Sequence, residues 1–187
     1  MKKFFALLLA TMLLAVMMLS VSAFALAEEE AGFDEYELGV EGEQDVGFMT
    51  MSMVYFQPVD MAPADLAAAK EDSDLHIEVD LTANENPYSF NVGEWVPYLS
   101  IDYTIFDTTG KEVMSGSMMP MAASDGPHYG NNIALPESEY SITIYVKSPA
   151  ENGYLLHVDP ETGVEADEFW TEPLTATWTG WNFVKEW

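Results

Sequence analysis

The sequence contains no cysteine and very few basic residues. Its 187 residues include no Cys and only six Lys plus Arg, against 32 Asp plus Glu, so the formal net charge at pH 7 is −26. The absence of Cys excludes disulfide bonds, iron–sulfur clusters and zinc sites with Cys ligands. Because the chain is so negative, it is a poor partner for nucleic acid or anionic lipid, whereas it attracts cations. We therefore expect no nucleic-acid partner.

Motifs of several enzyme classes are absent too. The sequence has no Gly-x-Ser-x-Gly, no P-loop and no Gly-x-Gly-x-x-Gly. Paired carboxylates are numerous, but in so acidic a chain a pair has no catalytic meaning by itself. The expectation is therefore a protein that is not an enzyme, with no catalytic residue to name.

The first residues predict export. The initiator Met precedes two Lys, residues 4–27 carry no charge, and an Ala-Leu-Ala step ends at Ala27 before three Glu. This is the pattern of a secretory signal peptide over 1–27, cleaved after Ala27. The uncharged run could also span a bilayer, so an uncleaved anchor is the alternative. The mature chain, 28–187, would lie in the periplasm or elsewhere outside the cytoplasm, and its formal charge would be 4 − 32 = −28.

The mature chain divides into an acidic segment and one domain. Residues 28–45 hold nine acidic residues in eighteen, together with three Gly, which predicts a flexible acidic segment. The remainder, 46–187, is long enough for a single domain with an ordinary hydrophobic core.

Alternating apolar and polar residues dominate this domain and predict short strands. No helical candidate is longer than 64–70. About seven strands with turn signals between them favour an all-β fold, an immunoglobulin-like antiparallel β-sandwich, with a closed barrel as the alternative. The predicted strands cover 46–56, 74–81, 98–106, 112–119, 140–147 and one or two strands within 171–184.

A row of methionines occupies one face of the first predicted strand. Met49, Met51 and Met53 are spaced by two, so they point the same way. Such a row suits copper, but on a strand it is more often part of the core, and the core interpretation is preferred here.

The strand predicted at 74–81 combines an apolar face with a polar one. His76, Glu78 and Asp80 share the polar face, where an imidazole and a carboxylate could reach one metal ion. The alternative is an ordinary solvated outer face.

The stretch 118–130, MMPMAASDGPHYG, offers a thioether at Met121, a carboxylate at Asp125 and an imidazole at His128. Its Gly and Pro residues predict a stiff, shaped loop, a good place to hold a metal. The alternative is a tight turn with Met121 in the core and His128 in solvent.

The chain has three His in all, and each lies near a carboxylate. The third, His157, is followed by Asp159. Three imidazoles and one thioether suit a copper site, and adjacent carboxylates add hard oxygen for Fe(II) or Mn(II). Copper binding should weaken as pH falls through about 6.5, because a protonated imidazole cannot ligate.

Five segments resemble the extracytoplasmic iron transport-associated family, periplasmic metal-binding proteins that partner an iron permease of the fungal high-affinity type. They are YFQPVDMAPADLAAAK, HIEVD, GEWVPYLSIDYTI, MPMAASDGPHYG and HVDPETG, and the similarity runs from about residue 54 to 183. The resemblance implies an immunoglobulin-like homodimer that binds Cu(II) together with iron, as Fe(II) or Fe(III), with Mn(II) or Zn(II) as surrogates. It implies these metal-site residues: His76, Glu78, Met121, His128 and His157.

On this resemblance we expect an exported metal-binding protein of iron uptake that works with an iron permease in the cytoplasmic membrane. Two alternatives stay open from the sequence. One is a copper-dependent ferrous iron oxidase, and the other is a non-catalytic adhesive β-sandwich whose His residues are incidental.

Overall fold

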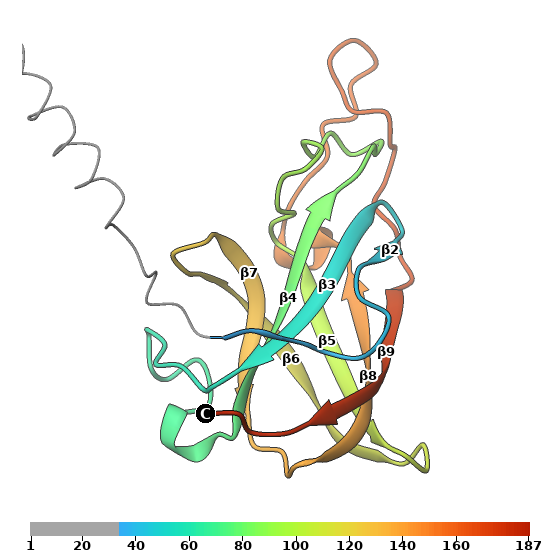
Figure 1. Ribbon diagram of the computed structural model, residues 1–187. Coiled ribbons are helices and arrows are strands. Elements are labelled where there is room, and N and C mark those ends of the chain that lie inside the picture. The colour runs from blue at the N-terminus through green and yellow to red at the C-terminus, as the bar shows by residue number, and fades with distance from the viewer. Residues whose placement is uncertain (1–33) are drawn as a thin grey trace, which may run out of the picture. The chain divides into compact units, whose positions relative to one another are not determined.

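Nine antiparallel strands build the part of the chain that the structure, a computed structural model, describes, residues 34–187 (Figure 1). The predicted signal peptide and residues 28–33 lie outside the described residues. Two short 3-10 helices, η1 (Lys70–Asp72) and η2 (Pro149–Asn152), accompany the strands. The strands are β1 (Tyr36–Glu37), β2 (Gln44–Val46), β3 (Met49–Phe56), β4 (Leu75–Ala83), β5 (Ser100–Asp107), β6 (Glu112–Ala122), β7 (Pro127–Ile133), β8 (Ser138–Lys147) and β9 (Leu174–Phe183).

The strands follow one another in the spatial order β1-β3-β4-β7-β6-β5-β8-β9, and β2 also pairs with β3. The long strand β6 joins the two layers, because its first part pairs with β5 and its last part, from Met119 on, pairs with β7. Residues that follow β1 bridge the two ends of this path: Leu38 donates its backbone N–H to Met53 and Val40 donates to Thr179. The predicted antiparallel β-sandwich is confirmed, in a strongly curled form.

Apolar side chains of both layers fill the space between them. Met49, Met51 and Met53 are at most 2% exposed, so the methionine row belongs to the core as predicted. Ile101 and Ile105 of β5 face them from the other layer with Trp178 of β9, and all are buried in the same cluster. About 25 cal/mol is gained for each Å² of apolar surface so buried, which explains how a chain without disulfides folds.

The acidic segment is ordered where the structure describes it. Tyr36 and Glu37 pair with β3, Leu38 is 1% exposed, and the carboxylate of Glu41 accepts hydrogen bonds from Thr179. Residues 34–45 were expected to be flexible; instead, buried Leu38 and these hydrogen bonds attach them to the sheet.

The longest helical candidate of the sequence, 64–70, forms no α-helix, and the chain makes turns there before η1. One local prediction was wrong. The stretch 118–130 is mostly strand, since β6 continues to Ala122 and β7 begins at Pro127, which leaves only 123–126 as a turn. None of the helices within 34–187 is long and apolar enough to cross a membrane.

Candidate metal centre

The outer face of β4, β7 and β6 carries most of the candidate ligands in a regular grid. His128 of β7 lies opposite Met121 of β6. The pairing of β4 with β7 ends at Val79 and Tyr129, the residues next to Asp80 and His128. Two residues further along β7, Gly130 lies opposite Glu78 of β4 on one side and Met119 of β6 on the other. Directly paired residues point to the same side of a sheet. The strand register therefore brings His128, Met121 and the two acidic residues of β4 together.

The ring of His76 is held by one hydrogen bond with a defined direction. Its Nδ1 atom lies 3.0 Å from Oδ1 of Asn132. The Asn132 amide nitrogen donates to the backbone carbonyls of Val59 and Ala68, so its oxygen must face His76 and accept. The hydrogen of His76 therefore sits on Nδ1, and Nε2 carries a free lone pair. A ligating His is held in this way by its other ring nitrogen.

The Nε2 atom of His76 is buried and has no hydrogen-bond partner among the described residues. It lies over Gly130, where an added Cβ would stand 2.5 Å from it. The ring of Phe56 packs on the same imidazole with centroids 5.0 Å apart. A buried acceptor without a partner costs free energy, and a metal ion would relieve that cost.

The second imidazole is oriented by a carboxylate. Nδ1 of His128 lies 3.1 Å from Oε1 of Glu78. Both side chains are nearly buried, with relative exposures of 6% and 4%. When Nδ1 donates to the carboxylate, Nε2 of His128 is the nitrogen left to ligate.

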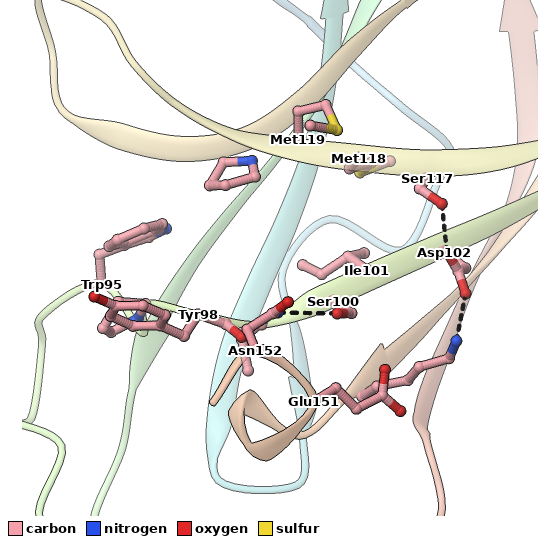
Figure 2. A pocket seen from close by; sticks show the side chains of 14 residues that line it. Trp95, Tyr98, Ser100, Ile101, Asp102, Ser117, Met118, Met119, Glu151 and Asn152 are labelled. Carbon is pink, nitrogen blue, oxygen red and sulfur yellow. Dashed lines mark hydrogen bonds and ion pairs between the residues drawn. The ribbon is translucent and has the colours of Figure 1, made fainter. Parts of the chain in front are cut away.

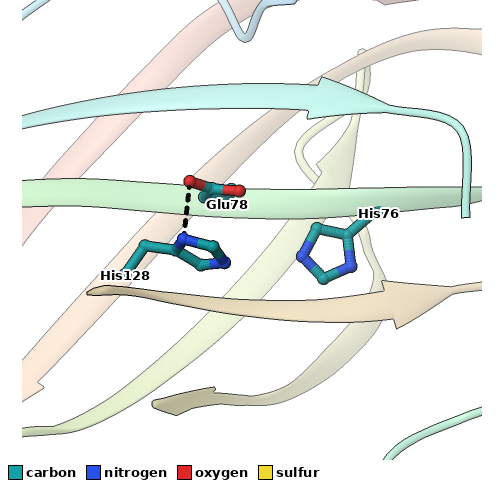
Figure 3. Close-up of side chains that lie close together, drawn as sticks. All are labelled: His76, Glu78 and His128. Carbon is teal, nitrogen blue, oxygen red and sulfur yellow. Dashed lines mark ion pairs between the residues drawn. The ribbon is translucent and has the colours of Figure 1, made fainter. Parts of the chain in front are cut away.

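Within residues 34–187, three side chains lie close enough together to bind one metal ion: His76, Glu78 and His128 (Figure 3). Each offers one ligand atom, and these atoms all lie within 4.8 Å of one another. The alternative of a solvated outer face fails, because His76 is 0% and Glu78 3% exposed. The segment that follows β3 covers this face, anchored by the two carbonyls that Asn132 binds.

Burial sets the protonation of the metal-free site. Desolvation lowers the pKa of His76 to about 4, with a smaller contribution from the nearby His128. Desolvation, the largest cause, and then the negative charges of Asp80, Asp125 and Glu35 raise the pKa of Glu78 to about 8. Desolvation also lowers the pKa of His128, although Asp80 and Asp125 oppose it. Burial therefore favours the uncharged forms of both imidazoles and of Glu78 in the metal-free site.

An acidic pocket of about 290 Å³ opens beside His128. Asp80, Glu94 and Asp125 line it with His128. Desolvation is the main cause that raises the pKa of Asp80, a hydrogen bond with Glu78 and the nearby His128 oppose it, and the charge of Asp125 adds to it. Excess negative charge with no basic side chain in the lining suits the entry of a cation.

A larger pocket, about 780 Å³, lies between β5 and the end of β6 (Figure 2). Its main charged groups already satisfy each other: Lys147 pairs with Asp102 at 2.9 Å, and Ser117 donates to the same carboxylate. No His lines it. This pocket is therefore not the metal centre.

The structure places the five predicted metal-site residues unequally. His76, Glu78 and His128 come together, and Met121 is the direct neighbour of His128 across the strands. His157 lies outside this group, exposed on the segment between η2 and β9 that projects beyond the sheet (Figure 1).

Sequence reasoning missed Asn132 and Gly130. Asn132 fixes the His76 tautomer, and Gly130 leaves room for the ring. No sequence signal identifies either role, because both depend on β4 and β7 being neighbours. The donor set of imidazoles, a thioether and a carboxylate fits copper, and the carboxylates around it fit a harder ion such as iron.

The fold and the site together define a β-sandwich class of metal-binding protein. The chain belongs to the family described as Fe2+ transport protein, whose sequence pattern matches residues 32–184. It is 41% identical over 157 residues to a 34 kDa membrane antigen of Treponema pallidum (strain Nichols), covering 81% of this chain and 76% of that one.

Two solved structures share the fold. One is FetP of uropathogenic Escherichia coli strain F11, expressed in the periplasm, with 38% identity, a TM-score of 0.72 and coverage of 82% of this chain and 98% of FetP. The other is copper-reconstituted P19 of Campylobacter jejuni, with 37% identity, a TM-score of 0.69 and coverage of 77% and 93%.

Proposed function

We propose that this protein is an exported metal-binding component of iron uptake that holds copper at His76, His128 and Met121, with Glu78 beside it. The observation that carries the proposal is the buried Nε2 of His76, which has a fixed lone pair, no partner among the described residues, and His128 and Glu78 within reach. Membership of the Fe2+ transport protein family supports the link to iron uptake.

Copper as the resident metal is supported by the ligand types and by the relatives. Imidazole and thioether ligands suit copper, which also leads the general affinity order of divalent metals. P19 is known in copper-reconstituted form, and FetP as a copper-bound variant. Iron would occupy the carboxylate-rich side of the site, near Glu78, Asp80 and Asp125, with Mn(II) or Zn(II) as surrogates.

A homodimer completes the ligand set in this proposal. His157 is exposed and stands between Leu155, 85% exposed, and Val158, 52% exposed. Exposed apolar residues on a projecting segment suit a contact with a second copy, and two-fold dimers are the commonest oligomers. We propose that His157 enters the metal site of the partner subunit, and that the exchange is mutual.

The protein would act outside the cytoplasm, after cleavage at Ala27, and pass iron to a permease in the cytoplasmic membrane. Expression of FetP in the periplasm supports this location. The formal charge of the mature chain, 4 − 32 = −28, supports a role in collecting cations near the membrane. We propose a binding protein and not an enzyme.

The experiment is metal analysis of residues 28–187 purified from the cell envelope without added metal, followed by Cu(II) titration of the wild type and His128→Ala. We expect about one copper per chain in the wild type and binding at least about tenfold weaker in the variant. Equal binding by His128→Ala would place the copper elsewhere. Sustained Fe(II) oxidation under O₂ would make the protein an oxidase, and failure to hold any metal would leave an adhesive sandwich.

A further inference from the structure

A second methionine shares the face of the metal site. Met119 and Met121 are two residues apart on β6, lie opposite Gly130 and His128, and are both half-buried. Met118, the residue before Met119, points the other way and is 3% exposed in the core. Met119 also contributes to the lining of the large pocket, where Figure 2 draws it at β6 beside Met118. The register with Gly130 and the burial of Met118 give its direction. The side chain of Met119 therefore belongs to the outer face.

No side chain of residue 130 separates Met119 from His76, because the imidazole itself lies over Gly130. Nε2 of His76 lies 2.5 Å from the position of a Gly130 Cβ, so the imidazole reaches over the strand that separates β4 from β6. Neighbouring strands are about 5 Å apart, which puts the Met119 Cα roughly 6 Å from that nitrogen. A methionine side chain has three rotatable bonds and can bring its sulfur to a metal bound there.

We propose that Met119 is a second thioether ligand, engaged when the site holds Cu(I). The inference rests on the copper site proposed above. Thioethers are soft ligands that select Cu(I), whereas imidazole and carboxylate ligands also serve Cu(II). Met119, opposite Gly130, and Met121, opposite His128, give the site two thioethers beside two imidazoles, a set that can hold both oxidation states of copper.

The competing explanation is that Met119 only fills space beside Gly130. Met→Leu substitutions keep volume and remove the sulfur, so they separate the two explanations. Met114 is the matched control, because it lies on the same strand, is half-buried, and pairs with Ile105 of β5 away from the site.

The first test is affinity for Cu(I), measured anaerobically by competition with a chromogenic Cu(I) chelator, beside calorimetric titration with Cu(II). Met119→Leu is expected to weaken Cu(I) binding by about tenfold or more and Cu(II) binding by less than about threefold. Met114→Leu is expected to change neither. Equal Cu(I) affinities for Met119→Leu and Met114→Leu would overturn the proposal.

The second test counts sulfur positions directly. Protein labelled with selenomethionine and loaded with Cu(I) is expected to show two selenium neighbours per copper by X-ray absorption, and one after Met119→Leu. One selenium in the wild type, unchanged by Met119→Leu, would overturn the inference and leave the copper site itself in place. A wild type that holds no copper would remove both proposals.

Discussion

Nε2 of His76 and residue 130 compete for the same space: a Cβ on Gly130 would lie 2.5 Å from that nitrogen and 2.9 Å from the carbonyl oxygen of Ile77. Glycine is required here by close approach and not by a left-handed backbone. We predict that Gly130→Ala displaces the imidazole and weakens Cu(II) binding by about tenfold or more. Calorimetric titration with Cu(II) measures this loss of affinity against the wild type.

Gly116→Ala is the control for crowding itself. Its Cβ would lie 2.6 Å from the hydroxyl of Tyr103, in the part of β6 that pairs with β5. Both variants should lose stability, on the order of 1–3 kcal/mol for overpacking. Only Gly130→Ala should lose copper affinity, and similar copper binding by the two variants would contradict the prediction.

The second prediction concerns the residue that fixes the His76 tautomer. Removing the amide in Asn132→Ala frees Nδ1 of His76 and should weaken copper binding by about 10–100-fold, although no ligand is lost. Asn131→Ala is the control, since the Asn131 amide donates to the Ser117 carbonyl instead. Nitrogen NMR of the metal-free protein should show the His76 proton leaving Nδ1 in Asn132→Ala alone. An unchanged tautomer would refute the role of Asn132.

The sequence predicted those parts of the fold and site that depend on local periodicity. Alternation placed His76 and Glu78 on one strand face, and it correctly assigned Met51 to the core. It did not predict that this face is buried, because the cover comes from a segment before η1 that Asn132 anchors. Gly130 was interpreted as a loop signal, whereas it lies within β7 and leaves room for an imidazole.

Complementation between subunits tests the third prediction, the exchange of His157. A mixed dimer of His128→Ala and His157→Ala chains has one complete site if the partner supplies His157, and none if each chain supplies its own. We expect half the wild-type number of tight copper sites in the mixed dimer. A mixed dimer without any tight site, or a protein that is monomeric by light scattering with and without copper, would contradict the exchange.

The fourth prediction is the pH at which copper is lost. The sequence alone suggested a midpoint near 6.5, but burial lowers the pKa of His76 to about 4 and also lowers that of His128. Protons therefore compete less with the metal at both imidazoles. Cu(II) titrations from pH 4 to 7 should give a midpoint about one unit or more below 6.5. A midpoint at or above 6.5 would show that the two imidazoles are not the dominant ligands.

The last prediction is the effect of Glu78 on the metal-free protein. Desolvation by burial is the main cause that raises its pKa from 4.5 to about 8. A raised pKa means that the folded state binds the proton more tightly than the unfolded state does. This contribution to stability is therefore complete below pH 4.5 and is lost as pH rises towards 8.

Glu78→Gln cannot ionise but still offers an oxygen to Nδ1 of His128, so it should escape that loss. With chelator present, we expect its free energy of unfolding to exceed that of the wild type by at least about 1 kcal/mol at pH 8. Near pH 5, where little of this stabilisation has been lost, the difference should shrink to below about 1 kcal/mol and lie well under its value at pH 8. Because His76 is unchanged, its own loss of stability in acid affects both proteins equally. Glu37→Gln, at an exposed position of β1, is the control and should follow the wild type at every pH. The free energy of unfolding is measured with denaturant at pH 5, 7 and 8. If it changes with pH in the same way for Glu78→Gln and the wild type, Glu78 is already ionised in the folded metal-free protein.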